Sequence, residues 1–506
     1  MPVHRLLAVP CVSCTSPQLW ERLQLQVKVN LTRITVRPLI DNLYPFTPYP
    51  QIAPGLFHPH GDNNRNAPRG KMLEKMTLAQ QLGTLQQHRA GNWAVTGARS
   101  RPNLHSILRY PAMMVPTMQG DIIDLLVGHV GNECRVVDTF VGSGTVLTES
   151  LIRGLDFTGC DINPLAVLVC EAKIAIDGGV NLEAAATSVL EAISSDASSS
   201  VDVNFPGLSK WFAIETSREL SRIRRSILDV EDQGARKVFW AVFAETIRLC
   251  SNSRTSTYKL HARKDDALVS WTKVQSIFRE NLANTLEKAG HYRELIDGRD
   301  ERPTACVHCA DVRAVSFDSN EAKHTILVTS PPYGDNQTTI PYGQFSYLAL
   351  CWIPAEDLPI EPGRLISNTH ALDSASLGGS LKGATEKAEA MRGVSPSLDQ
   401  LLDTPKGEPM VKELRKVASF MADFYNALSH IRHSLPGGAH WAFTTGNRRA
   451  AGRIIPFDQI CREMACTLGG RPVTSLQRSL PTKRMPSKNN MGEMITTENT
   501  LVVEFT

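Results

Sequence analysis

A strand pattern, a turn with two glycines and a helical pattern follow one another directly near residue 140 of this 506-residue chain. Val136 and Val137 begin an apolar run, Gly142 and Gly144 follow it, and residues 146–153 have a helical pattern. Glycine lets the chain turn without Cβ clashes, and backbone N–H groups at a helix N-terminus point towards a ligand. This order of elements predicts a binding pocket at the end of a buried strand.

A second strand pattern, residues 157–160, ends in the acid Asp161. In dinucleotide-binding folds an acid about 20 residues beyond the glycine turn binds the ribose hydroxyls. The third glycine of the dinucleotide fingerprint is missing, and so is the Gly-Lys-Ser/Thr of a phosphate-binding loop, which disfavours a pyrophosphate or triphosphate ligand. The two patterns together favour a cofactor that contains a nucleoside.

A third strand pattern, the uncharged residues 325–328, leads into two consecutive prolines. Proline can neither continue a ladder of hydrogen bonds nor follow a helical residue easily, so the chain must stop in a stiff turn. The turn presents a hydroxyl, a prolyl-flanked carbonyl and an aromatic ring, which together can hold a flat polar group. Its residues are Thr329, Ser330, Pro331, Pro332 and Tyr333. The alternative is an ordinary Pro-Pro turn that closes a strand.

These motifs resemble those of S-adenosylmethionine-dependent DNA methyltransferases that modify exocyclic amino groups. Residues 138–145 are similar to the family's DPFxGSGT cofactor motif, with Thr139 in place of proline, and residues 329–333 are similar to its catalytic motif. Residues 110–114 resemble the remaining cofactor element, and residues 309–313 resemble the acidic turn beside the adenine ring. The resemblance covers residues 105–180 and 300–350 with specific motifs, and residues 415–506 loosely.

The resemblance implies S-adenosyl-L-methionine as the cofactor. The implied cofactor-binding residues are Tyr110, Pro111, Asp138, Phe140, Gly142, Ser143, Gly144, Thr145, Asp161, Asn163, Asp311 and Thr329. The implied catalytic residues are Ser330, Pro331, Pro332 and Tyr333. In this interpretation Ser330 and the Pro331 carbonyl accept the hydrogens of the target amine, and Tyr333 stacks on the base.

The implied fold is α/β, a Rossmann-like, doubly wound and mostly parallel methyltransferase sheet with an antiparallel last strand and a helical insertion. We divide the chain into an N-terminal arm and linker (1–104), a cofactor-binding half (105–180), a helical insertion for target recognition (181–300) and a catalytic half (301–506). A segment rich in Pro, Gly, Ser and Lys, residues 355–410, is expected to be a mobile loop. Helices are expected at residues 71–87, 106–130, 182–193, 208–228, 239–249, 269–289, 412–432 and 457–467, and a basic linker at residues 89–101. Further strands are expected at residues 27–36, 440–445, 473–480 and 500–505. We expect the last two strands to form an antiparallel pair.

Two segments carry the polar and basic residues that are typical of nucleic-acid contacts. The candidates are Arg254, Ser256, Tyr258, Lys259, His261 and Arg263 in the insertion, and Arg478, Lys483, Arg484 and Lys488 near the C-terminus. The alternative for both segments is a solvated polar loop. Residues 334–350, also rich in hydrogen-bond donors, are expected to close over an extruded base.

Overall charge does not indicate a partner, because 54 basic and 51 acidic residues leave a net charge of only +3. The 11 cysteines lack a disulfide spacing, and neither a signal peptide nor an apolar run of membrane length is visible. We therefore expect a cytoplasmic protein without membrane association. The pair Cys306 and Cys309 has no second ligand pair at a suitable spacing, so no metal site is expected.

The predicted function is that of a site-specific enzyme that methylates the N4 amine of a flipped-out cytosine in double-stranded DNA, with a possible cognate restriction endonuclease as partner. The serine form of the catalytic tetrapeptide is commoner among N4-cytosine enzymes of the family. An N6-adenine DNA methyltransferase is the first alternative. An RNA amino methyltransferase and an inactive DNA-binding regulator are the others. The sequence specifies neither the recognition sequence, the oligomeric state nor the role of residues 1–65.

Overall fold

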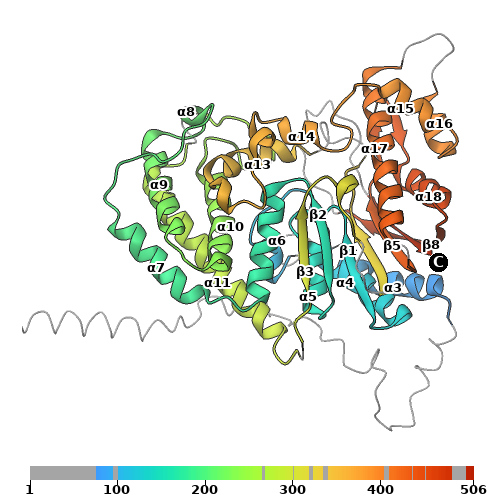
Figure 1. Cartoon of the computed structure of the whole chain (residues 1–506), viewed down its shortest axis with the longest axis horizontal. Helices are drawn as coiled ribbons and strands as arrows, with labels where there is room; N and C mark the ends of the chain where they lie inside the picture. Colours follow the sequence, from blue (N-terminus) through green and yellow to red (C-terminus); the bar gives the residue numbers. More distant parts are fainter. Residues whose placement is uncertain are drawn as a thin grey trace, which may run out of the picture. The chain divides into compact units, whose positions relative to one another are not determined.

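The structure, a computed structural model, describes residues 76–94, 101–264, 268–299, 301–317, 323–333, 340–403, 410–435, 437–450, 452–480 and 497–506 (Figure 1). The chain divides into two units at Gly70 and Lys71, and all described residues belong to the second unit, Lys71–Thr506. The strand expected at 27–36, the polar residues 334–339 and the candidate contacts Lys483, Arg484 and Lys488 lie outside the described residues.

A seven-stranded sheet with the order β3-β2-β1-β4-β5-β9-β8 organises the second unit. Its strands are β1 (Cys134–Asp138), β2 (Phe157–Asp161), β3 (Ala305–Cys309), β4 (His324–Thr329), β5 (Ala439–Thr445), β8 (Arg471–Ser479) and β9 (Thr497–Phe505). The first five are parallel, and β9 runs antiparallel to both β5 and β8. The predicted Rossmann-like α/β sheet is confirmed, together with its antiparallel last strand.

The sheet has an apolar core on each face, because successive residues of a strand point to opposite sides. Val136 and Ile326 belong to one apolar cluster, whereas Val137 and Leu327 belong to the other. The first cluster includes residues of α4 (Pro116–Val130), α5 (Thr145–Ile152) and α6 (Pro164–Asp177). The second includes residues of α17 (Lys412–Ser434) and α18 (Phe457–Thr467). Helices on both faces make the sheet doubly wound.

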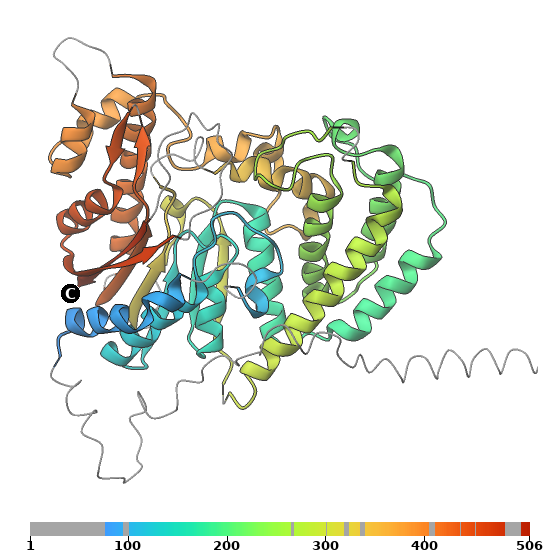
Figure 2. The ribbon, with the colours of Figure 1, turned by 180° about the vertical axis from the view of Figure 1, so that it is seen from behind.

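The first described helix, α3 (Leu78–Trp93), runs into the segment that we expected to be a basic linker from residue 89 onwards. Thr77 begins the helix through a capping box with Gln80, and the buried Trp93 indole donates to Asp121 of α4 at 2.8 Å. The expected linker is therefore wrong over residues 89–93, where a tertiary contact extends the helix. Figure 2 shows α3 beside α4.

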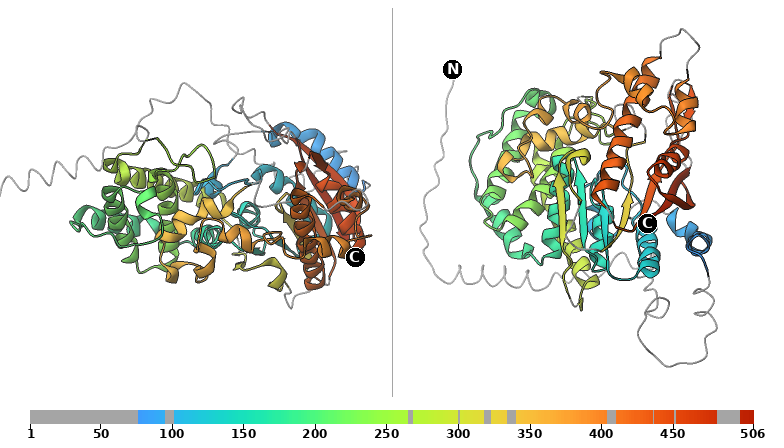
Figure 3. Two further views of the ribbon diagram at one scale, coloured as in Figure 1. Left: turned by 90° about the horizontal axis from the view of Figure 1, so that it is seen from above. Right: turned by 45° about the vertical axis from the view of Figure 1, so that its right-hand side comes forward.

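The insertion between α6 and β3 is helical, as predicted. It contains α7 (Leu182–Ser195), α8 (Leu208–Trp211), α9 (Ile214–Leu228), α10 (Gln233–Cys250), η4 (Trp271–Lys273) and α11 (Val274–Leu295), drawn in green in Figures 1 and 3. Helix α10 begins six residues before the expected start, because the Asp232 side chain accepts from the Ala235 N–H and caps it. Tyr292 of α11 donates a 2.6 Å hydrogen bond to Asp177 of α6, which fixes the insertion to the sheet domain. Its role in target recognition stays a prediction.

The segment expected as a loop at 355–410 contains regular structure. It follows α13 (Tyr342–Trp352) and forms η6 (Ala355–Asp357), η7 (Gly363–Ile366), α14 (Ala371–Ala375), α15 (Ala384–Ala390) and α16 (Pro396–Leu402). The expectation of irregular structure is corrected for the described residues up to 403, while mobility stays a prediction.

A short hairpin of β6 (Arg448–Ala450) and β7 (Arg453–Ile455) follows β5. Within the described ranges, no helix is both long and apolar enough to cross a membrane.

Candidate active site

The glycine turn between β1 and α5 depends on left-handed backbone conformations. Gly142 has φ +51° and Gly144 has φ +75°, values that side chains disfavour. A Cβ atom on Gly144 would lie 2.9 Å from the sulfur of Cys170, and one on Gly142 would lie 3.4 Å from the Tyr110 ring. Both conformation and space therefore require glycine at position 144.

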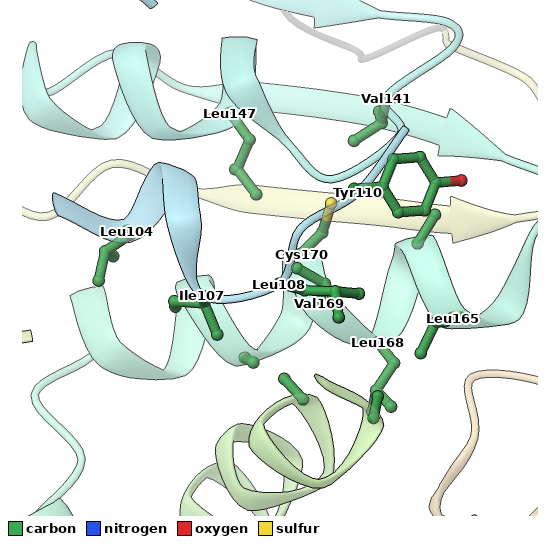
Figure 4. Close-up of a cluster of buried hydrophobic side chains, with 14 of the residues drawn as sticks. Leu104, Ile107, Leu108, Tyr110, Val141, Leu147, Leu165, Leu168, Val169 and Cys170 are labelled. Atoms are coloured by element: carbon green, nitrogen blue, oxygen red, sulfur yellow. The ribbon is translucent and has the colours of Figure 1, made fainter. Parts of the chain in front are cut away.

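Helix α6 holds the glycine turn from behind. The buried Lys173 Nζ donates to the carbonyl oxygens of Ser143 at 2.7 Å and Gly144 at 3.2 Å, and to Thr148 Oγ1 at 3.2 Å. The Cys170 thiol donates to the Gly142 carbonyl at 3.4 Å, and Figure 4 shows its sulfur directed towards the turn. Burial lowers the pKa of Lys173 to about 8. No sequence pattern indicated this support, since Lys173 lies within an apolar helix.

Asp161 connects the end of β2 to the glycine turn. Its Oδ2 accepts from the Gly142 N–H at 2.8 Å, and its Oδ1 accepts from the Asn163 N–H at 2.9 Å. Burial raises the pKa of Asp161. Each carboxylate oxygen has a second acceptor site, so the two hydrogen bonds leave capacity for a ligand hydroxyl.

Tyr110 and the residues that contact it lie beside the glycine turn. Asn163 Nδ2 donates to the Tyr110 hydroxyl at 2.9 Å and to Ser346 Oγ of α13 at 2.8 Å. The Tyr110 ring stacks on Tyr342 with a centroid distance of 5.7 Å, and Figure 4 shows it beside Val141. The following Ala112 has φ +48°, a strained value for alanine.

The glycine turn meets the turn of residues 329–333, which we call the catalytic turn after its predicted role, at the carboxyl ends of the neighbouring parallel strands β1 and β4. Thr329 Oγ1 donates to Asp138 Oδ1 at 2.7 Å, and Thr139 Oγ1 donates to Thr329 Oγ1 at 3.4 Å. Asp138 Oδ1 also accepts from the Phe140 N–H, whereas its buried Oδ2 has no hydrogen-bond partner among the described residues. Burial raises the pKa of Asp138 to about 7. Strand order reverses at β1 and β4, the position where α/β sheets bind ligands.

In the catalytic turn, Ser330 Oγ donates to the Thr444 carbonyl of β5 at 3.1 Å. A serine hydroxyl that donates its hydrogen keeps two acceptor lone pairs. The Tyr333 hydroxyl donates to Glu498 of β9 at 3.3 Å, and Glu498 also pairs with Arg478 at 3.0 Å. Burial raises the pKa of Tyr333, and the charge of Glu498 raises it further.

The two turns enclose one pocket of about 920 Å³, part of which is open to solvent. The predicted residues that line it are Tyr110, Pro111, Phe140, Gly142, Ser143, Thr145, Asp161, Asn163, Asp311, Ser330 and Pro332. Five other predicted residues lie outside the lining: Asp138, Gly144, Thr329, Pro331 and Tyr333. Asp138 and Thr329 instead connect the two turns from beneath, and the roles of all these residues stay predictions.

Asp311 lines the pocket, but its carboxylate is bound by a neighbour. Arg313 donates from Nε to Oδ1 at 3.0 Å and from Nη2 to Oδ2 at 2.5 Å, and its Nη1 lies 3.3 Å from Asp423. Burial alone would raise the pKa of Asp311, but the Arg313 guanidinium lowers it below the ordinary value. Any ligand group that contacts this carboxylate therefore shares it with Arg313.

The candidate nucleic-acid segment of the insertion is a short hairpin that contacts α13. Ser253 and Ala262 form an antiparallel bridge, and Arg254 donates through its N–H to the His261 carbonyl. Arg254, Ser256 and His261 are exposed, whereas Tyr258 packs edge-on against Phe345 of α13. Lys259 is half-buried, and Arg263 Nε donates to the Ser253 carbonyl at 2.8 Å. The hairpin thus lies beside the helix whose first residue lines the pocket.

The second candidate segment is described only at Arg478, whose guanidinium forms the ion pair with Glu498. This residue has a protein partner that the sequence pattern did not indicate, and its predicted contact with nucleic acid stays a prediction. Sequence reasoning also missed the pocket residues Tyr342, Leu372, Ser376 and Leu377. Only Tyr342 carried a signal, because it belongs to the donor-rich run after the catalytic turn.

Known proteins include a relative of this chain in sequence. No protein-family model matches the chain. The chain is 28% identical over 399 residues to the type II methyltransferase M.MvaI of Kocuria varians, an alignment that covers 75% of this chain and 85% of that protein. Among solved structures, the rRNA methyltransferase AviRa of Streptomyces viridochromogenes has 12% identity and a TM-score of 0.29, with coverage of 78% and 86% of the two chains. A TM-score this low supports no inference.

Proposed function

We propose that this chain is an S-adenosylmethionine-dependent DNA methyltransferase that modifies the N4 amine of cytosine at specific sites. The observation that carries the proposal is that Ser330 and Gly142, from two turns far apart in the sequence, line the same pocket. Similarity to a type II methyltransferase over most of both chains supports it. The relative's name also supports a place in a restriction-modification system, with an endonuclease as possible partner.

The residues around the pocket fit S-adenosylmethionine in chemistry. Asp161 offers carboxylate oxygens for ribose hydroxyls, and Phe140 and Val312 offer apolar surface for a purine. Gly142 lines the pocket without a side chain, so a ligand can approach its backbone directly. Among the described residues, the lining contains no lysine or arginine, which agrees with a cofactor that has no phosphate groups. When bound, S-adenosylmethionine supplies an electrophilic methyl group on its sulfonium.

The catalytic turn then positions the target amine. The lone pair of a cytosine N4 amine is delocalised into the ring, so the site must favour a pyramidal nitrogen. Because the Ser330 hydroxyl donates to Thr444, its lone pairs remain for one amine hydrogen, and the Pro331 carbonyl is the proposed acceptor for the other. Orientation of nitrogen and methyl group supplies much of the rate in this scheme.

A base in a duplex cannot reach this pocket, so the proposal requires base flipping. The hairpin of residues 252–263 is the proposed nucleic-acid contact, because Arg254 and His261 are exposed beside α13. Double-stranded DNA is the proposed substrate. Tyr333 is proposed to stack on the flipped base, with its hydroxyl held by Glu498.

The test is nucleoside analysis of DNA and of RNA, each treated with purified protein and isotope-labelled S-adenosylmethionine. N4-methylcytosine is the expected product. N6-methyladenine would overturn the cytosine assignment in favour of the first alternative, and label in RNA alone would favour the second. Donor binding without any product would favour an inactive DNA-binding regulator. Single-molecule sequencing of DNA from expressing cells tests site specificity, with all modified bases expected in one short sequence.

A further inference from the structure

One wall of the pocket comes from neither sequence motif. Leu372, Ser376 and Leu377 line it, and they lie in α14 and the residues directly after it. We call residues 371–378 the strap. Leu372 is 2% exposed and Leu377 is 5% exposed, although the strap is short and follows only two short 3₁₀ helices, η6 and η7. Two apolar side chains of the strap are therefore turned inwards.

The first end of the strap is fixed to α13. Asp373 Oδ1 accepts from the Gly343 N–H at 2.9 Å, next to the pocket residue Tyr342. A Cβ atom on Gly343 would lie 3.0 Å from Asp373 Oδ2 and 3.1 Å from the Thr369 carbonyl, so glycine permits this close approach. Figure 1 shows α13 and α14 beside each other.

The second end is fixed to α17. The Gly378 N–H donates to Asp423 Oδ2 at 2.9 Å, and Asp423 Oδ1 also accepts from Lys387 at 2.8 Å. Gly378 has φ +70°, and a Cβ atom there would lie 2.7 Å from Phe420 Cβ. The strap therefore spans from α13 to α17 with a defined contact at each end.

Leu377 belongs to the apolar cluster that includes Val312, and Phe140 packs against the same cluster. All three line the pocket, near Asp311 at the end of β3. Apolar side chains on several sides of a pocket suit a flat, largely apolar ring. Leu372 lies on the Tyr342 side, next to the anchor at Asp373.

We infer that the strap is a donor-binding element, in which Leu377 packs against the purine ring of S-adenosylmethionine and Leu372 closes the pocket. This inference rests on the proposed function, because it requires that the pocket bind this donor. It adds a third chain segment to the glycine turn and the catalytic turn. The strap also makes donor binding depend on α13 and α17.

The experiment compares Leu377→Ala and Leu372→Ala with the control Leu398→Ala in the full-length protein. Leu398 lies in α16, is 0% exposed and belongs to the same apolar cluster as Leu377, but it is not a pocket residue. Its truncation thus reproduces the loss of core packing without the loss of a pocket contact. Titration calorimetry measures the Kd of each protein for S-adenosylmethionine and for adenosine.

Both pocket variants are expected to bind S-adenosylmethionine about tenfold more weakly than Leu398→Ala, since each loses part of a buried leucine contact. Leu377→Ala is expected to weaken adenosine binding by a similar factor. Equal donor affinity in all three variants would overturn the inference, and so would an unchanged adenosine affinity in Leu377→Ala. If the wild-type protein binds no S-adenosylmethionine, the proposed function fails instead.

A further variant, Asp373→Ala, keeps both leucines but loses the hydrogen bond to Gly343. It is expected to release the donor faster than the wild type. An unchanged release rate would contradict the anchoring role of this hydrogen bond.

Discussion

Thr329 donates a 2.7 Å hydrogen bond to Asp138 although the two residues are 191 positions apart in the chain. Both are fully buried, at 0% exposure. Asp138 is the last residue of β1 and Thr329 is the last residue of β4. Their hydrogen bond therefore connects the glycine turn with the catalytic turn. The contact explains why a threonine at the end of β4 and an acid at the end of β1 belong to one site.

Replacement of Thr329 by valine should destabilise the protein. The variant keeps the side-chain shape but leaves the buried Asp138 carboxylate with one hydrogen-bond donor fewer. We expect the free energy of unfolding to fall by about 1–3 kcal/mol in urea titrations. Thr329→Ser retains the hydroxyl and should lose less. Equal stability of the valine variant and the wild type would show that the bond contributes nothing.

Asp138 should also produce a pH dependence. Its folded-state pKa of about 7 lies above the ordinary value of 3.8, so the folded protein holds an extra proton between these limits. The free energy of unfolding should therefore decrease as pH rises from about 4 to about 7, and this contribution should level off above 7. Asp138→Asn mimics the protonated acid, so its stability relative to wild type should increase between pH 5 and pH 8. If the difference in unfolding free energy between Asp138→Asn and the wild type were the same at pH 5 and at pH 8, this assignment would be contradicted.

Gly144→Ala should be costly, whereas Gly91→Ala should not. At Gly144 the added Cβ has φ +75° and lies 2.9 Å from Cys170 Sγ, but at Gly91 in α3 it meets nothing within 4 Å. We expect Gly144→Ala to lower the free energy of unfolding by about 1–3 kcal/mol and to weaken donor binding. Gly91→Ala should be neutral or stabilising by up to about 1 kcal/mol, because alanine favours a helix. Thermal melting and calorimetry distinguish the two.

Lys173→Met should weaken donor binding through the backbone of the glycine turn. The variant removes the hydrogen bonds to the Ser143 and Gly144 carbonyls but leaves every pocket side chain in place. We expect Kd for S-adenosylmethionine to rise several-fold. Lys288→Met is the control, since it also removes a lysine contact to a backbone carbonyl, that of Ser106, which does not belong to the glycine turn. The same Kd in both variants would argue against a role of Lys173 in positioning the turn.

Ser330→Ala should separate donor binding from transfer. The hydroxyl contacts Thr444 and lines the pocket, so its loss should leave the Kd for the donor near the wild-type value. The loss of one amine acceptor should lower the rate of methyl transfer by about a hundredfold. Ser397→Ala is the control, since this hydroxyl binds Glu463. Unchanged transfer in Ser330→Ala would require another role for the catalytic turn.

The sequence predicted the elements whose pattern is local. Helix α18 matches its predicted range of 457–467 because its apolar residues recur with helical spacing. The pair of β8 and β9 was also predicted, as alternation and β-branched residues are visible within each strand. The glycine turn and the Pro-Pro turn were located from residue types alone.

Contacts between distant segments could not be predicted. Helix α14 has only five residues, and its position depends on Asp373 reaching Gly343 of another helix. The ion pair of Arg478 could not be predicted either, because its partner Glu498 belongs to a different strand, β9. Lys173 was hidden for the same reason, since its acceptors are carbonyl groups about 30 residues earlier in the chain.

The pairing of β1 with β4 has a consequence for assembly of the protein. Val136 lies opposite Ile326, and the whole helical insertion is contained in the intervening chain. Closing so large a loop is entropically unfavourable until the long-range contacts form, which slows folding in proteins of this kind. Neither half of the chain has a complete pocket, because a fragment that ends before β4 would lack Ser330, Pro332 and the strap. Recovery of donor affinity during refolding would therefore mark the moment at which the two halves of the sheet join.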